Sequence, residues 1–326
     1  MNKPSLCIVT PALADANNGN WQTARRWSRL LSGHYAVRLA RAWPDRGITD
    51  DGTDILIALH ARRSADSVAA WAQAHPERPL VLALTGTDLY RDIHTDARAQ
   101  RSLALAQRLI VLQALGPQSL PEAHRGKCEV VFQSSTRRQA LCKTRDHLRA
   151  VVVGHLREEK SPQTVFEAAR MIRPGEGILL DHIGAALDPA LADLARATAD
   201  ACPHYRWLGG LPHEATRRRI QRAHLLLHPS RMEGGAHVIM EAALSGTPVL
   251  ASRMDGNVGM LGPDYGGYFP VGDAAALVAR LRACRQDIAA GGGSLAALQA
   301  QCSARATRFE PAAEQAALLK VLDGLV

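Results

Sequence analysis

The chain has 326 residues and a formal net charge of +8, and it is 47% hydrophobic but only 4% aromatic. This length is sufficient for two domains that each have a hydrophobic core. No run of 18 apolar residues occurs, so the sequence predicts no transmembrane helix. The segment 1–5 leads into an apolar strand without a secretory apolar region, so we expect a cytoplasmic protein. The six cysteines have neither CxxC nor zinc spacing, which predicts free thiols and no metal site.

The basic residues are densest at Arg217, Arg218, Arg219 and Arg222, on one predicted helix. A basic protein can bind nucleic acid, membranes or small anions. No recognisable nucleic-acid module or aromatic platform accompanies these arginines. We therefore interpret the cluster as a solvated helix face and expect neither a nucleic-acid nor a membrane partner.

Short apolar runs alternate with alanine- and arginine-rich helical patterns in the first half of the chain. The predicted strands are 5–10, 37–42, 54–59, 80–84, 109–112 and 129–132. The predicted helices are 21–32, 65–74 and 97–106. This alternation predicts parallel strands joined by right-handed crossovers.

A polar, strongly basic segment, 136–147, separates this half from a second one and is interpreted as an interdomain linker. The same alternation then restarts. The predicted strands are 150–154, 178–183, 205–209, 225–228 and 249–252, and the predicted helices are 162–173, 187–202, 213–223, 273–290 and one that starts at 308–311. The sequence therefore predicts an α/β protein with two doubly wound, Rossmann-like domains whose loops surround a shared cleft, where ligands bind beyond the carboxyl ends of the strands.

Two carboxylates, Glu233 and Glu241, bracket the most informative segment. Between Gly234 and Ser252 almost every residue is apolar or small, and the titratable groups are Glu241 and His237. A buried carboxylate is unfavourable unless it is paired or hydrogen-bonded. Glu241 therefore needs either a protein partner or a ligand.

A glycine-rich turn lies between these carboxylates. Gly234 and Gly235 follow the predicted strand 225–228 and precede a helical pattern that ends at Gly246, a residue suited to a helix C-cap. Free N–H groups at the start of such a helix favour phosphate, whereas a carboxylate one turn further on suits sugar hydroxyls. The combination predicts a nucleotide-sugar site. The alternative is a core helix with one satisfied glutamate.

Several motifs together resemble a known family. They are Gly154 with Lys160, Gly209, Pro229-Ser230, the Glu233-x7-Glu241 pair and Gly246-x-Pro248-Val249. On these motifs the second half resembles the retaining GT-B glycosyltransferases of family four. This resemblance implies an acceptor-side domain at 1–146, a nucleotide-sugar-binding domain at 147–307, and a crossing helix at 308–326 that packs back on the first domain.

The resemblance also implies roles at matching positions. Lys160 contacts the donor diphosphate, Glu241 holds the ribose hydroxyls and Glu233 holds the hexose hydroxyls. The expected sugar and phosphate contacts from the turn are Gly234, Gly235, Ala236, His237 and Val238, and the uracil is expected near Gly209 and Leu211.

Two positions depart from the family pattern. His155 stands where the family has an arginine five residues before the lysine, so a titratable imidazole replaces a permanent cation. Either phosphate binding is weaker, or Arg157 compensates, or the acceptor chemistry needs less positive charge. The approximate position of the usual acceptor-domain histidine carries Thr85-Gly86.

Within this family, the chain is most similar to the selenosugar synthases of selenoneine biosynthesis. The similarity includes the loop Asn17-Asn18-Gly19-Asn20, the segment 85–88 and the segment 153–157. It implies transfer of glucose or N-acetylglucosamine from a UDP-sugar to selenophosphate, with no cofactor and no metal. The expected acceptor-binding residues are Gly19, Asn20, His60, Arg62, Arg63, Thr85, Gly86, Thr87 and Asp88. Two alternatives stay open, namely a family-four enzyme with a hydroxyl acceptor and a non-catalytic nucleotide-sugar-binding protein.

Overall fold

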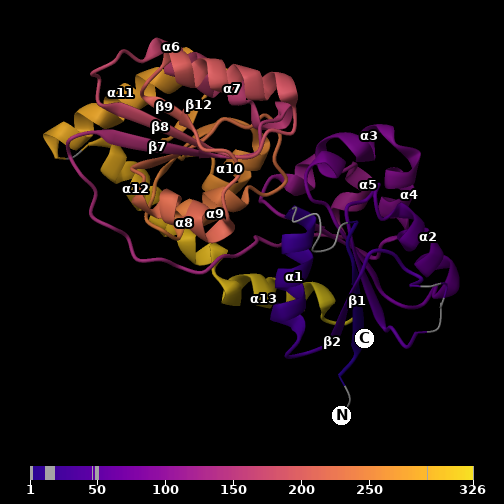
Figure 1. Cartoon of the computed structure of the whole chain (residues 1–326). Helices are drawn as coiled ribbons and strands as arrows, with labels where there is room; N and C mark the ends of the chain where they lie inside the picture. The colour runs from indigo at the N-terminus through magenta and orange to yellow at the C-terminus, as the bar shows by residue number, and fades with distance from the viewer. Residues whose placement is uncertain (1–2, 12–18, 46, 48–50, 292, 326) are drawn as a thin grey trace. The chain divides into compact units, whose positions relative to one another are not determined.

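The computed structural model describes residues 3–11, 19–45, 47, 51–291 and 293–325. Contacts within the chain divide it into two compact units (Figure 1). The first unit comprises Met1–Gln133 and Pro311–Val326, and the second comprises Ser134–Glu310. Within the described ranges, no helix has both the length and the apolar character needed to cross a lipid bilayer.

The first unit contains a six-stranded parallel sheet with the order β2-β1-β3-β4-β5-β6. The strands are β1 (Ser5–Val9), β2 (Ala36–Ala40), β3 (Ile55–Leu59), β4 (Leu80–Ala83), β5 (Arg108–Val111) and β6 (Cys128–Val130). Each corresponds to a predicted strand within one or two residues, because continuous apolar runs bounded by polar turns are typical of strands buried on both faces. The expected parallel arrangement of the first half is confirmed.

Helices cover both faces of this sheet. They are α1 (Gly19–Leu31), α2 (Ala65–Ala74), α3 (Ile93–Thr95), α4 (Ala97–Leu105), α5 (Glu122–Arg125) and α13 (Pro311–Leu322). Alternate residues of β3 serve opposite cores: Leu56 packs in the same cluster as Trp71 of α2, and Ile57 packs in the same cluster as Trp27 of α1. The period-two alternation of side chains along a strand accounts for this division.

A buried carboxylate joins α13 to α1. Glu314 is 1% exposed and accepts hydrogen bonds from Trp27 Nε1 at 2.7 Å and from Arg26 Nε at 2.8 Å. Leu318 and Leu322 of α13 complete the apolar cluster around Trp27. The expectation that the C-terminal helix packs on the first unit is met by these contacts.

The second unit contains another six-stranded parallel sheet, with the order β12-β11-β10-β7-β8-β9. The strands are β7 (Leu148–Val153), β8 (Ile178–Ile183), β9 (Tyr205–Trp207), β10 (Leu225–His228), β11 (Val249–Ser252) and β12 (Tyr268–Phe269). The chain leaves β7 for β8 and returns through β10 to the other side of β7. This change of direction is the switch point at which ligands bind in such sheets.

The helices of the second unit form two layers. Figure 1 shows α6 (Pro162–Met171), α7 (Pro189–Ala201) and α11 (Ala274–Ala290) over one face of the sheet, and α8 (His213–Arg222), α9 (His237–Ala243) and α12 (Ser294–Ala306) over the other. The short α10 (Asp255–Leu261) follows β11. Gly246 has a φ of 67°, and its N–H donates to Ala243 O, so the predicted glycine stop after α9 is confirmed.

Two α-helices and one strand of the second unit, namely α10, α12 and β12, were not predicted. Strand β12 has only two residues, which is too short for an apolar period. Helix α10 contains two glycines, which are poor helix formers, and α12 is rich in alanine and glutamine without a clear apolar face.

The predicted linker segment, 136–147, packs on the second unit. Arg138 N donates to Leu244 O, and His224 Nε2 lies 2.9 Å from Thr144 O. Lys143 is largely buried, and this burial lowers its pKa to about 8. These contacts assign the segment to the second unit, whose first residue is Ser134.

We expect Glu314→Ala to lower the free energy of unfolding by about 3 kcal/mol, because it leaves a buried indole N–H and a guanidinium without their acceptor. The measurement is urea unfolding followed by tryptophan fluorescence. Glu122→Ala, which removes an exposed carboxylate in the same unit, is the control and should change stability by no more than about 0.5 kcal/mol. Equal midpoints for the two variants would contradict the prediction.

Candidate active site

Glu233 and Lys160 form an ion pair in the second unit. Glu233 lies between β10 and α9, and Lys160 ends a short 3₁₀ helix, Glu158–Lys160, that follows β7. Lys160 Nζ lies 2.5 Å from Glu233 Oε1, and His228 Nε2 lies 3.3 Å from the same oxygen. Burial alone would raise the pKa of Glu233, but the Lys160 charge and His228 outweigh burial and hold this pKa well below its usual value. Glu233 is therefore ionised at neutral pH.

Close backbone approach brings the two partners together. Arg231 N donates to Glu159 O at 2.9 Å, which ties the loop after β10 to the loop that carries Lys160. The stem of Lys160 packs over Gly154, and a Cβ at Gly184 would lie 1.8 Å from Gly154 O. Only glycine fits at position 184, because an added Cβ would overlap this carbonyl oxygen, whereas a Cβ at position 154 would crowd the Lys160 stem at 3.3 Å.

Glu241 lies in the middle of α9 and is 2% exposed. His213 Nε2 lies 2.5 Å from Glu241 Oε1, His237 Nδ1 lies 3.4 Å from it, and Arg217 Nε lies 3.9 Å from it. Burial acts to raise the pKa of Glu241, but hydrogen bonds from the two histidines lower it to about 2. The sequence predicted that this carboxylate needs either a protein partner or a ligand, and the structure supplies three protein partners.

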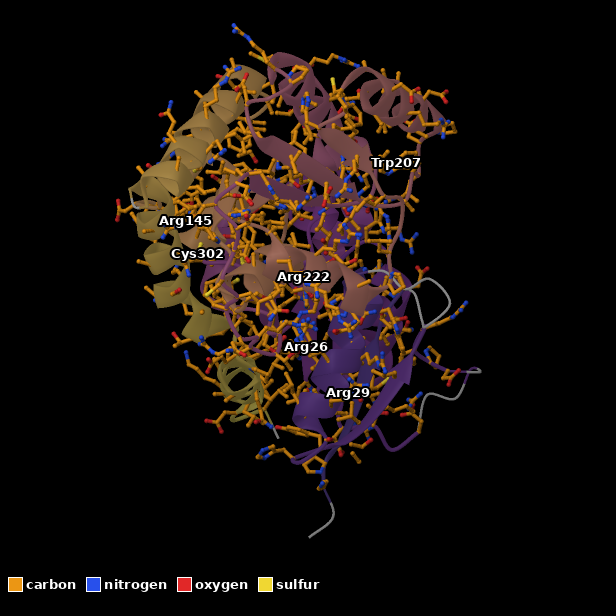
Figure 2. All side chains as sticks on the ribbon, turned by 60° about the vertical axis from the view of Figure 1, so that its left-hand side comes forward. Arg26, Arg29, Arg145, Trp207, Arg222 and Cys302 are labelled. Atoms are coloured by element: carbon orange, nitrogen blue, oxygen red, sulfur yellow. The ribbon has the colours of Figure 1, made fainter. Side chains whose placement is uncertain are left out.

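Three residues of this arrangement were not predicted as site residues, namely His213, Arg217 and His228. Arg217 was interpreted as part of a solvated face, and this is wrong, because it is 5% exposed and donates to Thr136 Oγ1 at 2.7 Å. Arg222 at the end of the same helix is exposed (Figure 2). The i, i+4 spacing of His213 and Arg217 indicates that both lie on one face of the helix, but it does not indicate that this face meets Glu241.

His155 follows β7, and its side chain is held by the backbone. Ala185 N donates to His155 Nδ1 at 3.2 Å, so the neutral imidazole carries its proton on Nε2. Burial lowers the pKa of His155, and the charges of Arg157 and Lys160 lower it further. A neutral donor therefore stands where the family pattern has a cation, and the nearby cations are Arg157 and Lys160.

The remaining donor-side candidates lie at the carboxyl ends of these strands. Gly209 has a φ of 65°, and its carbonyl accepts a hydrogen bond from Gly184 N at 2.8 Å. Leu211 is half-buried two residues before α8. Gly234, Gly235, Ala236 and Val238 form the turn and first residues of α9, between the two glutamates.

The acceptor-side candidates at the ends of β3 and β4 lie together in the first unit. His60 is 2% exposed with a φ of 76°, and its Nε2 lies 3.3 Å from Thr87 Oγ1. Asp88 is fully buried and accepts from Ala61 N, Thr85 N and Gly86 N at 2.9 to 3.0 Å. The Asp88 carboxylate thus fixes the two loops to each other.

The two candidate arginines of this group differ. Arg62 Nε donates to Asp92 Oδ2 at 2.9 Å, and Asp92 is 4% exposed. The Arg62 charge is therefore compensated within the unit, whereas Arg63 is exposed. Gly19 and Asn20 begin α1, and the other two residues of the predicted loop, Asn17 and Asn18, lie outside the described residues.

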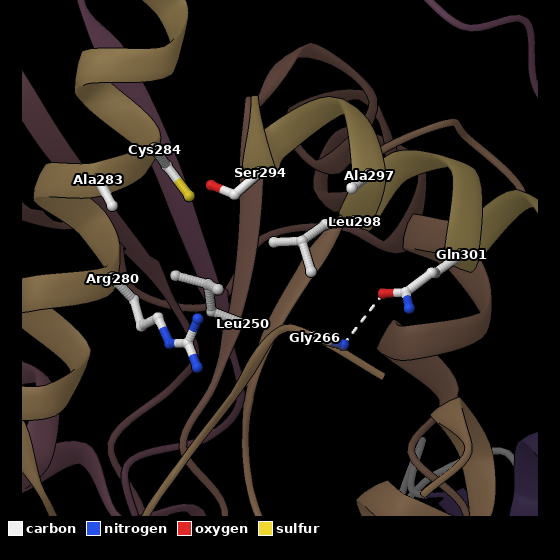
Figure 3. Close-up of a pocket in the computed structure, with 9 residues that line it drawn as sticks. All are labelled: Leu250, Gly266, Arg280, Ala283, Cys284, Ser294, Ala297, Leu298 and Gln301. Carbon is white, nitrogen blue, oxygen red and sulfur yellow. Dashed lines mark hydrogen bonds between the residues drawn. The ribbon is translucent and has the colours of Figure 1, made fainter. Parts of the chain in front are cut away.

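A cavity of about 280 Å³ lies elsewhere in the second unit, between α11, α12 and β11 (Figure 3). Gly266 N, at its rim, donates to Gln301 Oε1 at 3.0 Å. The lining residues are Leu250, Gly266, Arg280, Ala283, Cys284, Ser294, Ala297, Leu298 and Gln301. No predicted site residue is among them, so this cavity is separate from the glutamate segment.

The family model described as glycosyl transferases group 1 matches residues 112–288, which is more than half of the chain. The chain belongs to the group 1 glycosyltransferases. The matched range contains the donor-side candidates of this glycosyltransferase and none of its acceptor-side candidates, which lie between residues 19 and 88. No curated protein matches the sequence.

Solved structures of similar fold cover nearly the whole glycosyltransferase. HepE of Anabaena, solved with UDP and glucose, has 15% identity and a TM-score of 0.72 over 98% of this chain and 99% of that chain. Sucrose-phosphate synthase of Thermosynechococcus elongatus has 16% identity and a TM-score of 0.74 over 99% of both chains. The lipopolysaccharide outer core galactosyltransferase WaaB has 14% identity and a TM-score of 0.71 over 99% of this chain and 100% of that chain. These similarities show the two-domain GT-B fold expected from the sequence.

We expect the stability contributed by Glu241 to depend on pH. Its pKa in the folded protein lies below the ordinary value of 4.5, so the contribution is present above pH 4.5 and is lost as the pH falls toward about 2. Glu241→Gln should therefore cost on the order of 2–3 kcal/mol at neutral pH and progressively less below pH 4.5. Urea unfolding across this pH range measures the difference.

The control for this prediction is Glu167→Gln, which alters an exposed carboxylate of α6. Its effect should be small at every pH. A Glu241→Gln penalty that stays constant down to about pH 3 would contradict the assigned ion pairing.

Proposed function

We propose that this glycosyltransferase transfers a hexose, glucose or N-acetylglucosamine, from a UDP-sugar to selenophosphate. The observation that supports the donor class is the pair of ionised carboxylates in the segment 233–241. Glu233 is held by Lys160 and Glu241 by His213, in both cases through Oε1. A carboxylate that stays ionised in a segment of small, apolar residues is a strong acceptor for sugar hydroxyls.

Each donor-side residue has a proposed role. Lys160 has three N–H donors, and those not used by Glu233 bind the diphosphate and stabilise the charge that develops as UDP leaves. Glu233 binds hexose hydroxyls, and Glu241 binds the ribose hydroxyls. His155 donates from Nε2, with Arg157 as the neighbouring cation, and the proposal includes no metal and no cofactor.

Further donor contacts are proposed for the backbone. The turn and the first turn of α9 contact sugar and phosphate through Gly234, Gly235, Ala236, His237 and Val238, and the loop at Gly209 and Leu211 borders the uracil.

The proposed acceptor step needs no side-chain base. A selenium lone pair attacks the anomeric carbon and forms the Se–C bond, while the bond from that carbon to the donor oxygen breaks and its electron pair leaves with UDP. Selenophosphate is already an anionic nucleophile, so no proton has to be removed from it. Hydrolysis of the Se–P bond then gives the selenosugar and phosphate. What supports this acceptor is the resemblance carried by the segments 85–88 and 153–157.

A second candidate is transfer to a hydroxyl acceptor. It is favoured by the charge balance at the ends of β3 and β4, where two buried carboxylates, Asp88 and Asp92, accompany His60 and the compensated Arg62. Such a group can accept hydrogen bonds from hydroxyls, whereas a multiply charged anion needs donors. For selenophosphate, the proposed donors are Arg63, Thr87 and the N–H groups of Gly19 and Asn20.

The test of the proposed function is incubation with UDP-glucose or UDP-N-acetylglucosamine and selenophosphate, with and without EDTA, followed by mass spectrometry. We expect a hexose–selenium product, equimolar UDP and no effect of EDTA. A product formed only with a hydroxyl acceptor would establish the second candidate instead. UDP-sugar binding without any turnover would indicate a non-catalytic binding protein.

We expect Lys160→Ala to reduce kcat by at least about a hundredfold, because it removes the cation proposed to stabilise the leaving diphosphate. Thermal unfolding monitors the fold. Lys320→Ala, which removes an exposed lysine on α13, is the control and should leave kcat unchanged. Wild-type kinetics in Lys160→Ala would remove this residue from the site.

We expect Arg63→Gln to raise the KM for selenophosphate about tenfold or more, with the KM for the UDP-sugar unchanged, because a charge-assisted hydrogen bond is lost. Arg101→Gln, at an exposed position of α4, is the matched control. An unchanged KM for selenophosphate would exclude Arg63 from the acceptor site.

A further inference from the structure

The contacts of Glu241 are one-sided. His213, His237 and Arg217 all approach Oε1. Among the described residues, no hydrogen bond reaches Oε2. An ionised carboxylate oxygen accepts up to two hydrogen bonds, so Oε2 can take both hydroxyls of a vicinal diol. The arrangement fixes one oxygen and leaves the other for a ligand.

His213 is the partner that fixes Oε1 directly. Its Nε2 lies 2.5 Å from Oε1, compared with 3.4 Å for His237 and 3.9 Å for Arg217. The two terminal nitrogens of Arg217 donate to Thr136 Oγ1 and Thr136 O, so this residue acts on Glu241 through its charge. The geometry therefore assigns the shortest and most directional contact to His213.

The side chain of His213 is more exposed than is usual for a residue that only stabilises the fold. It is the first residue of α8, and its side chain is 68% exposed. The hydrogen bond to Glu241 raises the pKa of His213, and burial and the Arg217 charge oppose this rise. Both the neutral Nε2 tautomer and the imidazolium donate from Nε2, so the contact persists on either side of the titration.

We propose that His213 is a positioning residue that holds the Glu241 side chain in the rotamer presenting Oε2 to the ribose hydroxyls of the UDP-sugar. This inference rests on the proposed function, because it assumes that Glu241 binds ribose. It adds a residue of α8, outside the segment 233–241, that helps the site to distinguish ribose from deoxyribose.

The test is isothermal titration calorimetry with UDP and with 2′-deoxy-UDP. We expect the wild-type chain and Arg222→Ala, a control at the exposed end of α8 (Figure 2), to prefer UDP by at least about tenfold. Glu241→Ala should abolish this preference. His213→Ala should reduce it about fivefold or more, and His213→Gln, whose amide N–H can donate to Oε1, should restore most of it.

The ratio of the two affinities separates positioning from folding. Loss of structure would weaken both nucleotides equally and leave the ratio unchanged, and that result for His213→Ala would overturn the inference. If the wild-type chain does not bind UDP, or if Glu241→Ala keeps the preference for UDP over 2′-deoxy-UDP, Glu241 does not bind ribose. Both the proposed role of Glu241 and this inference are then wrong. If Glu241→Ala loses the preference while His213→Ala keeps it, only the role of His213 is overturned. None of these outcomes depends on the identity of the acceptor.

Discussion

Two carboxylates are buried in one short segment at the carboxyl edge of the second sheet. Their burial requires compensating groups from the neighbouring loops and helices. Glu233 and Glu241 both remain ionised because cations or imidazoles from neighbouring loops compensate the loss of water. Lys160 reaches Glu233 from the loop after β7, and His213 reaches Glu241 from the start of α8. The loops after β7 and β10 therefore meet at Glu233, and helices α8 and α9 meet at Glu241. Close glycine packing at Gly154 and Gly184 allows the loops to approach near enough to meet them.

Much of this architecture follows from local sequence patterns. Buried parallel strands are continuous apolar runs, so strands such as β8 and β10 were predicted to the residue. Glu241 was identified because a lone carboxylate in an apolar stretch needs compensation. The identity of its partners could not be predicted in this way, since His213 and Arg217 are distant in sequence and meet it only after α8 packs on α9. Arg217 was misassigned for the same reason: a run of arginines indicates exposure unless tertiary contacts, here with Thr136, bury one of them.

In the first unit too, the contacts of the acceptor-side residues could not be predicted from local sequence patterns. The ends of β3 and β4 were predicted to carry the acceptor loops, and those loops do lie together. What the sequence did not reveal is how their charges are balanced, because Asp92 is close to Arg62 only in the folded unit. His60 adopts a left-handed backbone conformation, which is unfavourable for a residue other than glycine, and the contacts around Asp88 and Thr87 hold it there.

The contact between Glu314 and Trp27 spans 287 positions in sequence. The first unit therefore includes residues from both ends of the chain, with the entire second unit between them. During synthesis the second unit leaves the ribosome before α13. Helix α1 therefore lacks the contacts of α13 until the whole second unit has been made. Contacts of such long range form slowly, because a large loop must close first. The apolar cluster around Trp27 includes side chains of α13, so this core cannot be completed before the second unit has been synthesised.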